Sequence, residues 1–279
     1  MPELPEVEAV VRTLRPLVQG RRVRCAHVFH PIATKPQGAA HVSRFAERQR
    51  IRTVGRKGKY VLLHLDRGLL TFHFRLDGQL LWFSNAKELF RCANQHEAGV
   101  HVDVAFELAR GVLGFADQRH FGRVHAWNSV EECRGLTALG IDALSSEFTP
   151  RRFQELLAAS KRPLKAFLLD QKRVAGIGNM YSCESLWHAR LDPRRRANSL
   201  NSREALRLHK AIVSVLKRAL ECCLHPAPDF RDPQWWFQGL ERLLRVYGHE
   251  GKSCRRCGWP IRRIAQGGRS TYYCGRCPK

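Results

Sequence analysis

Hydrophobic and polar residues follow different periods in different parts of the chain. Near the N-terminus, apolar residues recur at helical spacing and Pro5 suits a first turn, which predicts a helix from about residue 5 to 18. Residues from about 21 to 130 then read as strands. The clearest apolar or alternating runs are 61–65, 69–74, 80–83 and 100–106, separated by turns at 66–68, 77–78 and 109–111. This spacing favours an antiparallel sandwich or barrel.

The pattern changes after about residue 134, where helical periodicity replaces strand-like alternation. Four segments carry the helical pattern: 153–157, 164–170, 180–189 and 203–220. They predict a helical domain over roughly 135–225. Three prolines follow within a few residues of each other, so we expect a loop over 225–235.

The chain is strongly basic along its whole length. It has 279 residues, with 48 Lys+Arg against 25 Asp+Glu and a net charge of +23. A hydrophobic content of 44% is ordinary for a globular protein, so the charge does not indicate disorder. The expected partner is a polyanion, with nucleic acid first. Since no apolar run approaches the roughly 20 residues of a membrane span, and no signal peptide is recognisable, we expect a cytoplasmic protein without a membrane partner.

Four of the ten cysteines are concentrated near the C-terminus. Cys254, Cys257, Cys274 and Cys277 form two Cys-x-x-Cys pairs with 16 residues between them. Tetrahedral Zn²⁺ accepts four thiolates, and four sulfurs leave no position for water, so this spacing predicts one structural zinc. A redox pair is the alternative. The other six cysteines are scattered, and we expect them to be reduced and buried, or incidental.

The first residues contain a candidate nucleophile. Because Met1 precedes a small residue, we expect its removal, which leaves Pro2 with a secondary amine. An α-amino group titrates at roughly 8, so a useful fraction is neutral at neutral pH and can attack carbon to form an iminium. Glu3 and Glu6 place carboxylates nearby for proton transfer. The alternative is an ordinary helix start with favourable acidic residues.

Two glycine-containing turns suit phosphate binding. The turn at 176–179 opens a helix, so it can present backbone N–H groups and the amide of Asn179 to a phosphate. A glycine helix cap is the alternative there. The basic turn at 55–60 precedes a strand and places Lys59 either against phosphate or in an ordinary charged turn.

Two further stretches, 73–78 and 117–122, each place an arginine and a bulky apolar residue just before a glycine. Leu76, Arg119 and Phe121 can wedge into a duplex and fill the gap left by an extruded nucleotide. Periodicity alone favours core packing for Leu76 and Phe121.

Together these stretches resemble one family, the bacterial formamidopyrimidine-DNA glycosylases, within the wider group that includes the endonuclease VIII-like enzymes. The match runs from end to end and in order. It includes Pro-Glu-Leu-Pro-Glu-Val-Glu at 2–8 and the segments 58–60, 117–122, 176–179, 246–248 and 269–277. Leu4, where the endonuclease VIII branch has glycine, favours the formamidopyrimidine branch.

The resemblance implies a bifunctional DNA glycosylase and AP lyase that acts as a monomer on double-stranded DNA containing damaged bases or abasic sites. The implied fold class is α+β. It has an N-terminal antiparallel β-sandwich with an N-terminal helix over 1–134, a helix–two-turn–helix DNA-binding domain over 135–235 and a zinc ribbon over 244–279, with DNA held in the cleft between. The protein would be cytoplasmic and nucleoid-associated, and the chemistry itself would need no cofactor.

The resemblance also assigns roles to individual residues. Pro2 would attack C1′ of an extruded damaged nucleotide, and Glu3 would donate the proton that opens the deoxyribose. Lys59 matches the lysine of β-elimination, and Arg269 matches the zinc-finger arginine of δ-elimination. The positions that match or adjoin DNA contacts are His73, Leu76, His101, Arg119, Phe121, Lys165 and Asn179.

The chain departs from the family pattern at several positions. Leu76 replaces a methionine, and Arg75 replaces the glycine before it. His120 stands where Asp-Pro-Arg-Arg-Phe-Gly has its second arginine, and Gly99 replaces one member of a His-x-His pair.

Residues 225–230 occupy the region of a Gly-Gly-Thr-Thr stretch that covers the flipped 8-oxoguanine in the family. One alternative is therefore the same chemistry on oxidised pyrimidines or hydantoins. An alternative of another class is a non-catalytic zinc-ribbon DNA-binding protein. The joint presence of Pro2, Glu3, Lys59 and Arg269 argues against that class, because binding alone needs no terminal proline.

Overall fold

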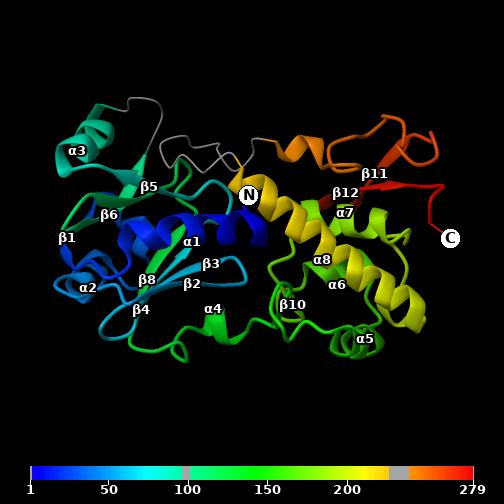
Figure 1. The fold of residues 1–279 in the computed structure, drawn as a ribbon, viewed down its shortest axis with the longest axis horizontal. Coiled ribbons are helices and arrows are strands. Elements are labelled where there is room, and N and C mark those ends of the chain that lie inside the picture. Colours follow the sequence, from blue (N-terminus) through cyan, green and yellow to red (C-terminus); the bar gives the residue numbers. More distant parts are fainter. Residues whose placement is uncertain (1, 96–100, 226–238, 279) are drawn as a thin grey trace. The chain divides into compact units, whose positions relative to one another are not determined.

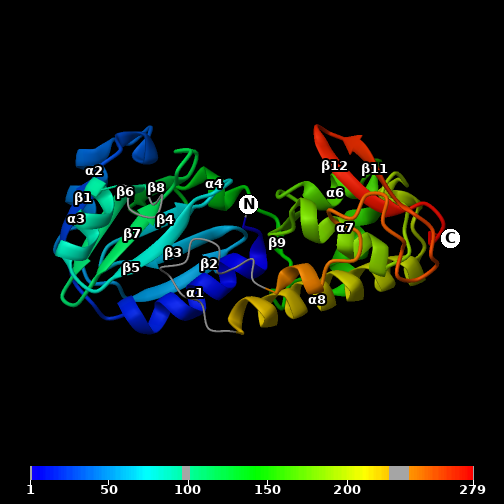
Figure 2. The same ribbon diagram turned by 90° about the horizontal axis from the view of Figure 1, so that it is seen from above.

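The computed structural model describes residues 2–95, 101–225 and 239–278. These residues form two compact units, whose ribbons are drawn in Figures 1 and 2. The first unit holds residues 2, 6–95, 101–137 and 223–225, and the second holds 3–5, 138–222 and 239–278. Gly99 and all but the first residue of the loop expected over 225–235 lie outside the described residues. Within them, no helix is both long enough and apolar enough to cross a membrane.

The described part of the first unit contains two four-stranded antiparallel sheets (Figure 1). Their strand orders are β2-β3-β4-β8 and β1-β6-β7-β5. The strands are β1 (Val23–Val28), β2 (Thr53–Lys57), β3 (Tyr60–His64), β4 (Leu69–His73), β5 (Gln79–Phe83), β6 (Val102–Leu108), β7 (Val112–Ala116) and β8 (Arg123–Trp127). Phe72 of β4 lies 6.0 Å from Phe106 and 6.1 Å from Phe115, between ring centroids, so the two sheets face each other across an apolar core. The predicted antiparallel sandwich is confirmed.

The predicted N-terminal helix is confirmed as α1 (Leu4–Val18). Its apolar residues at helical spacing are buried, which explains the periodicity. On its polar side, Arg15 donates a 3.0 Å hydrogen bond to the Val54 carbonyl of β2, and Glu8 pairs with Arg56 at 2.9 Å. These contacts hold α1 against β2.

The interpretation of the whole segment 21–130 as strands is wrong for two α-helices, α2 (Ala39–Ala46) and α3 (Ala86–Gln95), and for one short 3₁₀ helix. The signal for α3 was present in the sequence as a capping pattern. The Asn85 side chain accepts from the Glu88 N–H at 2.9 Å, and the Glu88 carboxylate accepts from the Ser84 N–H at 2.8 Å. The unit also contains the short helices η1 (Pro31–Thr34) and α4 (Arg134–Thr137).

The second unit confirms the four predicted helices, with ends shifted by up to four residues. They are α5 (Pro150–Ala158), α6 (Leu164–Leu169), α7 (Asn179–His188) and α8 (Ser202–Leu224). Shorter elements are the parallel pair β9 (Ile141–Asp142) and β10 (Val174–Ala175), with η3 (Ala197–Ser199) and η5 (Leu240–Arg242). The hairpin of β11 (Ile261–Gln266) and β12 (Arg269–Cys274) turns at Gly267 and Gly268, whose φ angles of 55° and 72° suit a two-residue hairpin loop.

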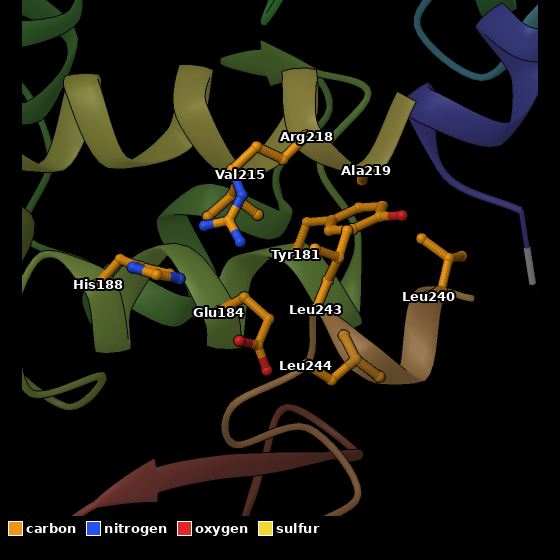
Figure 3. A pocket seen from close by; sticks show the side chains of 9 residues that line it. All are labelled: Tyr181, Glu184, His188, Val215, Arg218, Ala219, Leu240, Leu243 and Leu244. Atoms are coloured by element: carbon orange, nitrogen blue, oxygen red, sulfur yellow. The ribbon is translucent and has the colours of Figure 1, made fainter. Parts of the chain in front are cut away.

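Glu184 of α7 holds the segment that leads from η5 to the β11–β12 hairpin. Its carboxylate is buried and accepts the backbone N–H groups of Arg245, Val246 and Tyr247 at 2.9, 3.0 and 2.9 Å. Burial raises the pKa of Glu184, and these three donors oppose the rise. Figure 3 shows its side chain beside a small pocket, which α7, α8 and the 240–244 segment line.

Replacing Glu184 by alanine should strongly destabilise the second unit. Three backbone N–H groups would lose their acceptor, and a buried unsatisfied donor costs about 1–3 kcal/mol. We expect a loss of roughly 3 kcal/mol in the free energy of unfolding, measured by urea denaturation. The control is Glu221→Ala on the exposed side of α8, which should change stability little. Equal stability of the two variants would contradict the role of Glu184.

Candidate active site and metal centre

The four C-terminal cysteines come together in the arrangement that zinc requires. The Sγ atoms of Cys254 and Cys277 are 3.7 Å apart, and Cys257 Sγ lies 3.5 Å from both Cys274 and Cys277. Four thiolates at a Zn–S distance of about 2.3 Å in a tetrahedron are separated by about 3.8 Å. The cysteines therefore fit one zinc ion. With four sulfur ligands the metal is structural.

The zinc ribbon is packed onto α7. The Trp187 indole N–H donates to Cys254 Sγ at 3.3 Å, and the Arg256 guanidinium stacks 4.0 Å from the centroid of the Trp187 ring. Cys183 of α7 belongs to the same apolar cluster as the buried ribbon residues. Zinc binding and the attachment of the hairpin to α7 therefore depend on overlapping contacts.

Glu3 occupies the N-terminus of α7. Its carboxylate accepts the backbone N–H groups of Gly178, Met180 and Tyr181 at 2.6, 2.8 and 3.4 Å, and only 3% of the residue is exposed. A helix N-terminus favours an anion, because its first N–H groups have no partner within the helix. The expectation that this turn offers open N–H groups to a phosphate is wrong for these three groups, since Glu3 already occupies them.

The glycine at position 176 makes room for the N-terminal segment. The Leu4 N–H donates to the Gly176 carbonyl at 3.1 Å. A Cβ atom on Gly176 would lie 2.3 Å from Leu4 Cδ1, and its φ of +99° is unfavourable for any other residue. This glycine therefore serves the docking of Leu4.

Lys165 and Asn179 lie beside this turn. Lys165 is fully buried, and its ammonium donates to the Asn179 carbonyl at 2.9 Å and to Cys183 Sγ at 2.7 Å. Burial lowers the pKa of Lys165. The Asn179 side chain donates to the Ser270 carbonyl at 3.0 Å, which links the start of α7 to the strand that carries the exposed Arg269. A DNA contact by Lys165 stays a prediction, and in this arrangement its amine points inward.

In the first unit, Pro2 is buried and Lys59 lies half-buried in the turn between β2 and β3. His73 lies at the end of β4, with its ring 4.5 Å from that of Tyr60. Burial, together with the charges of Arg75 and Lys59, lowers the pKa of His73 to about 3. His73 is therefore neutral at physiological pH, so it can form hydrogen bonds but adds no charge for a phosphate.

The structure brings together the stretches 73–78 and 117–122, which contain the residues expected to fill the gap left by an extruded nucleotide. Arg119 is hydrogen-bonded to the carboxylate of Asp77, which follows Leu76, and its guanidinium lies 5.8 Å from the centroid of the Phe121 ring. Phe121 is 50% exposed, so the core-packing interpretation is wrong for this residue. Leu76 is half-buried. One surface therefore presents an arginine beside an exposed aromatic ring.

Sequence reasoning missed a buried carboxylate beside this surface. Asp103 of β6 is fully buried, and its Oδ1 lies 2.7 Å from His120 Nδ1. Burial raises the pKa of Asp103 to about 6, while the contact with His120 acts in the opposite direction. The ring of His101 lies 6.5 Å from that of His120. The two partners are separated by 17 residues, so no local spacing indicated the contact.

The chain combines an antiparallel β-sandwich, a helical unit that holds Glu3 at a helix start, and a four-cysteine zinc ribbon. This combination defines the class as a multidomain zinc-ribbon protein. Family models match in the same order. They are the formamidopyrimidine-DNA glycosylase N-terminal domain over residues 1–124, its H2TH domain over 139–224, and the zinc finger found in this glycosylase and in isoleucyl-tRNA synthetase over 251–279. The chain belongs to the formamidopyrimidine-DNA glycosylase family, and the resemblance stated from the sequence is confirmed.

Individual relatives agree over the full length. The formamidopyrimidine-DNA glycosylase of Pelotomaculum thermopropionicum is 36% identical over 285 residues, covering 100% of this chain and 99% of the relative. The Lactococcus lactis enzyme in complex with DNA containing an abasic site has a TM-score of 0.85 and 27% identity, covering 99% of both chains. The same enzyme in complex with DNA containing an oxidised pyrimidine has a TM-score of 0.85 and 27% identity, covering 100% of both chains.

Replacing Cys277 by serine should remove one zinc ion per chain relative to the unsubstituted protein, because the tetrahedral site loses one of its four thiolates. Metal analysis after dialysis measures this loss. The control is Cys222→Ser on α8, which should retain the full zinc content. We also expect the Cys277 variant to bind DNA more weakly while its β-sandwich remains folded. Full zinc content in that variant would contradict the assignment.

Proposed function

We propose that this protein is a bifunctional DNA glycosylase and AP lyase of base-excision repair, which excises oxidised bases of the formamidopyrimidine and 8-oxoguanine type. The observation that carries the proposal is the position of Glu3, the residue directly after Pro2 in the chain. Three backbone N–H groups at the start of α7 hold its carboxylate in place. A terminal amine with a fixed carboxylic acid beside it suits nucleophilic attack and proton transfer on a sugar.

In the proposed reaction, the Pro2 nitrogen forms a bond to C1′ of the extruded nucleotide while the bond from C1′ to the base breaks, and the base leaves with a proton from water. The Glu3 carboxylate takes the proton that the Pro2 nitrogen loses. Glu3 donates a proton to the ring oxygen of the deoxyribose, which opens the ring. The nitrogen then forms an iminium with C1′. A secondary amine forms this cation without losing a second proton, and the positive charge acidifies the C2′–H bond.

Glu3, ionised again, then takes the C2′ proton, and β-elimination expels the 3′ phosphate. We propose that Lys59 assists this elimination. A second elimination releases the 5′ phosphate. We propose that Arg269 assists this step, since it lies exposed at the start of β12. General acid–base groups of this kind contribute about 10²–10⁴-fold to a rate. The zinc ion takes no part in these steps.

The proposed partner is double-stranded DNA, held through the basic surface that the net charge of +23 provides. Leu76, Arg119 and Phe121 would fill the space of the extruded nucleotide, as the exposure of Phe121 supports. The proposed contacts to the DNA backbone come from His73, His101 and Asn179. Lys165 would support them from within, through its hydrogen bond to the Asn179 carbonyl.

We further propose three domains over 1–134, 135–235 and 244–279, and activity as a monomer. Bacterial relatives support a cytoplasmic location. Association with the nucleoid is our further proposal, based on the expected binding to DNA.

Incubation with DNA containing an abasic site and sodium borohydride should trap a covalent adduct on the N-terminal peptide, because the hydride reduces the iminium at Pro2. Extending the chain by residues before Pro2 should abolish trapping, since the nitrogen becomes a non-nucleophilic amide while every side chain remains. The same extension at the C-terminus is the control and should leave trapping intact. Adduct yield is measured on denaturing gels, and the attachment site by peptide mass analysis.

Trapping that survives the N-terminal extension would sink the Pro2 mechanism. DNA binding without any trapping in the unextended protein would favour the non-catalytic alternative.

A panel of lesion duplexes tests the substrate range. We expect faster excision of formamidopyrimidine and 8-oxoguanine than of oxidised pyrimidines or hydantoins, measured as single-turnover rates. Two observations favour the alternative substrates, oxidised pyrimidines or hydantoins. Residues 225–230 differ from the family pattern, and the Lactococcus lactis enzyme is seen with DNA containing an oxidised pyrimidine. The reverse order of rates would establish that alternative.

A further inference from the structure

Three side chains of the first unit form a cluster that is separate in sequence from the four cysteines. His30, Asp103 and His120 each offer one potential ligand atom, and these atoms all lie within 4.8 Å of one another. The rings of His30 and His120 are 4.8 Å apart between centroids. None of these residues has a role in the glycosylase and lyase chemistry proposed above.

Backbone contacts fix all three positions. The N–H groups of Phe29 and His30, which follow β1, both donate to the Asp103 carbonyl, at 2.8 and 3.1 Å, and hold His30 beside Asp103. His120 lies in a tight turn, where its N–H donates to the Asp117 carbonyl at 3.1 Å and its φ is +54°. This left-handed conformation is uncommon for a residue other than glycine. The turn therefore holds the imidazole toward Asp103.

The Asp103 carboxylate has capacity for another partner. Asp103 is fully buried, and among the described residues its Oδ2 atom has no hydrogen-bond partner, whereas Oδ1 contacts His120. A buried carboxylate oxygen without a partner is costly, and a cation is one way to satisfy it.

We propose that His30, Asp103 and His120 form a second metal site, which binds one zinc ion. Two imidazole nitrogens and one carboxylate oxygen are a ligand set that zinc accepts at about 2.0–2.2 Å. Imidazole ligands disfavour Mg²⁺ and Ca²⁺, which prefer oxygen. Three protein ligands leave one position for water, which can enter beside the exposed His30 and the half-buried His120.

One of the three proposed ligands, His120, departs from the family pattern. Where the family pattern described above has an arginine, this chain has His120. An arginine can pair with Asp103 but cannot bind a metal, because it has no acceptor nitrogen. His120 lies between Arg119 and Phe121, so a bound ion would also fix the turn that presents those two side chains.

The competing explanation is a simple pair between His120 and Asp103. That pair needs neither His30 nor a metal, and His120→Arg would preserve a pair with Asp103 while removing a ligand. The two explanations therefore differ in their dependence on His30 and in their zinc content.

The test is zinc content per chain after the purified protein is saturated with zinc chloride and dialysed against metal-free buffer. We expect two ions per chain in the unsubstituted protein, and one in His30→Gln and in His120→Arg. The matched control is His41→Gln, an exposed histidine of α2, which should retain two. Thermal melting checks that each variant is folded. One ion per chain in the unsubstituted protein, or two in both ligand variants, would overturn the proposal.

A second measurement does not depend on variants. In protein whose ribbon is already loaded, added zinc should shift the NMR signals of the His30 and His120 ring protons and leave those of His41 unchanged. Unshifted His30 and His120 signals at saturating zinc would overturn the proposal as well.

Discussion

The hydrogen bonds from the N-terminus of α7 to the Glu3 carboxylate are the interaction on which the second unit depends most. They join residues separated by 175 positions or more and place an anion where a helix start favours one. They also explain Gly176, because Leu4 follows Glu3 into the space that a side chain at position 176 would fill.

Successive turns of α7 carry the other important contacts of this unit. Glu184 holds the backbone of residues 245–247, Cys183 packs into the ribbon cluster, and Trp187 contacts the zinc ligand Cys254. The helix whose N-terminus holds Glu3 therefore also supports the zinc ribbon. A structural metal can in this way affect the position of Arg269 without taking part in the reaction.

Periodicity predicted most regular elements, because one buried face imposes a repeat on the sequence. It failed for α3, whose signal is a capping pattern at its first turn rather than a long repeat. It also failed for Phe121, whose apolar side chain is exposed. The turn at 176–179 shows a different limit. Two glycines indicate unusual backbone or close packing, but they do not identify the neighbour, and here that neighbour is the N-terminal segment of the same chain.

The sequence by itself determined the zinc ribbon and pointed to the candidate nucleophile. Two Cys-x-x-Cys pairs need only local chain geometry to bring thiolates to a metal, and the amine expected at Pro2 after removal of Met1 is a covalent property. The tertiary structure alone decided that Glu3 occupies the start of α7 and that His30, Asp103 and His120 meet. These neighbours are far apart in the chain and are set by the pairing of β1 with β6, the turn at 117–122 and the packing of α7. No short-range pattern encodes those contacts, since they form only when the elements assemble.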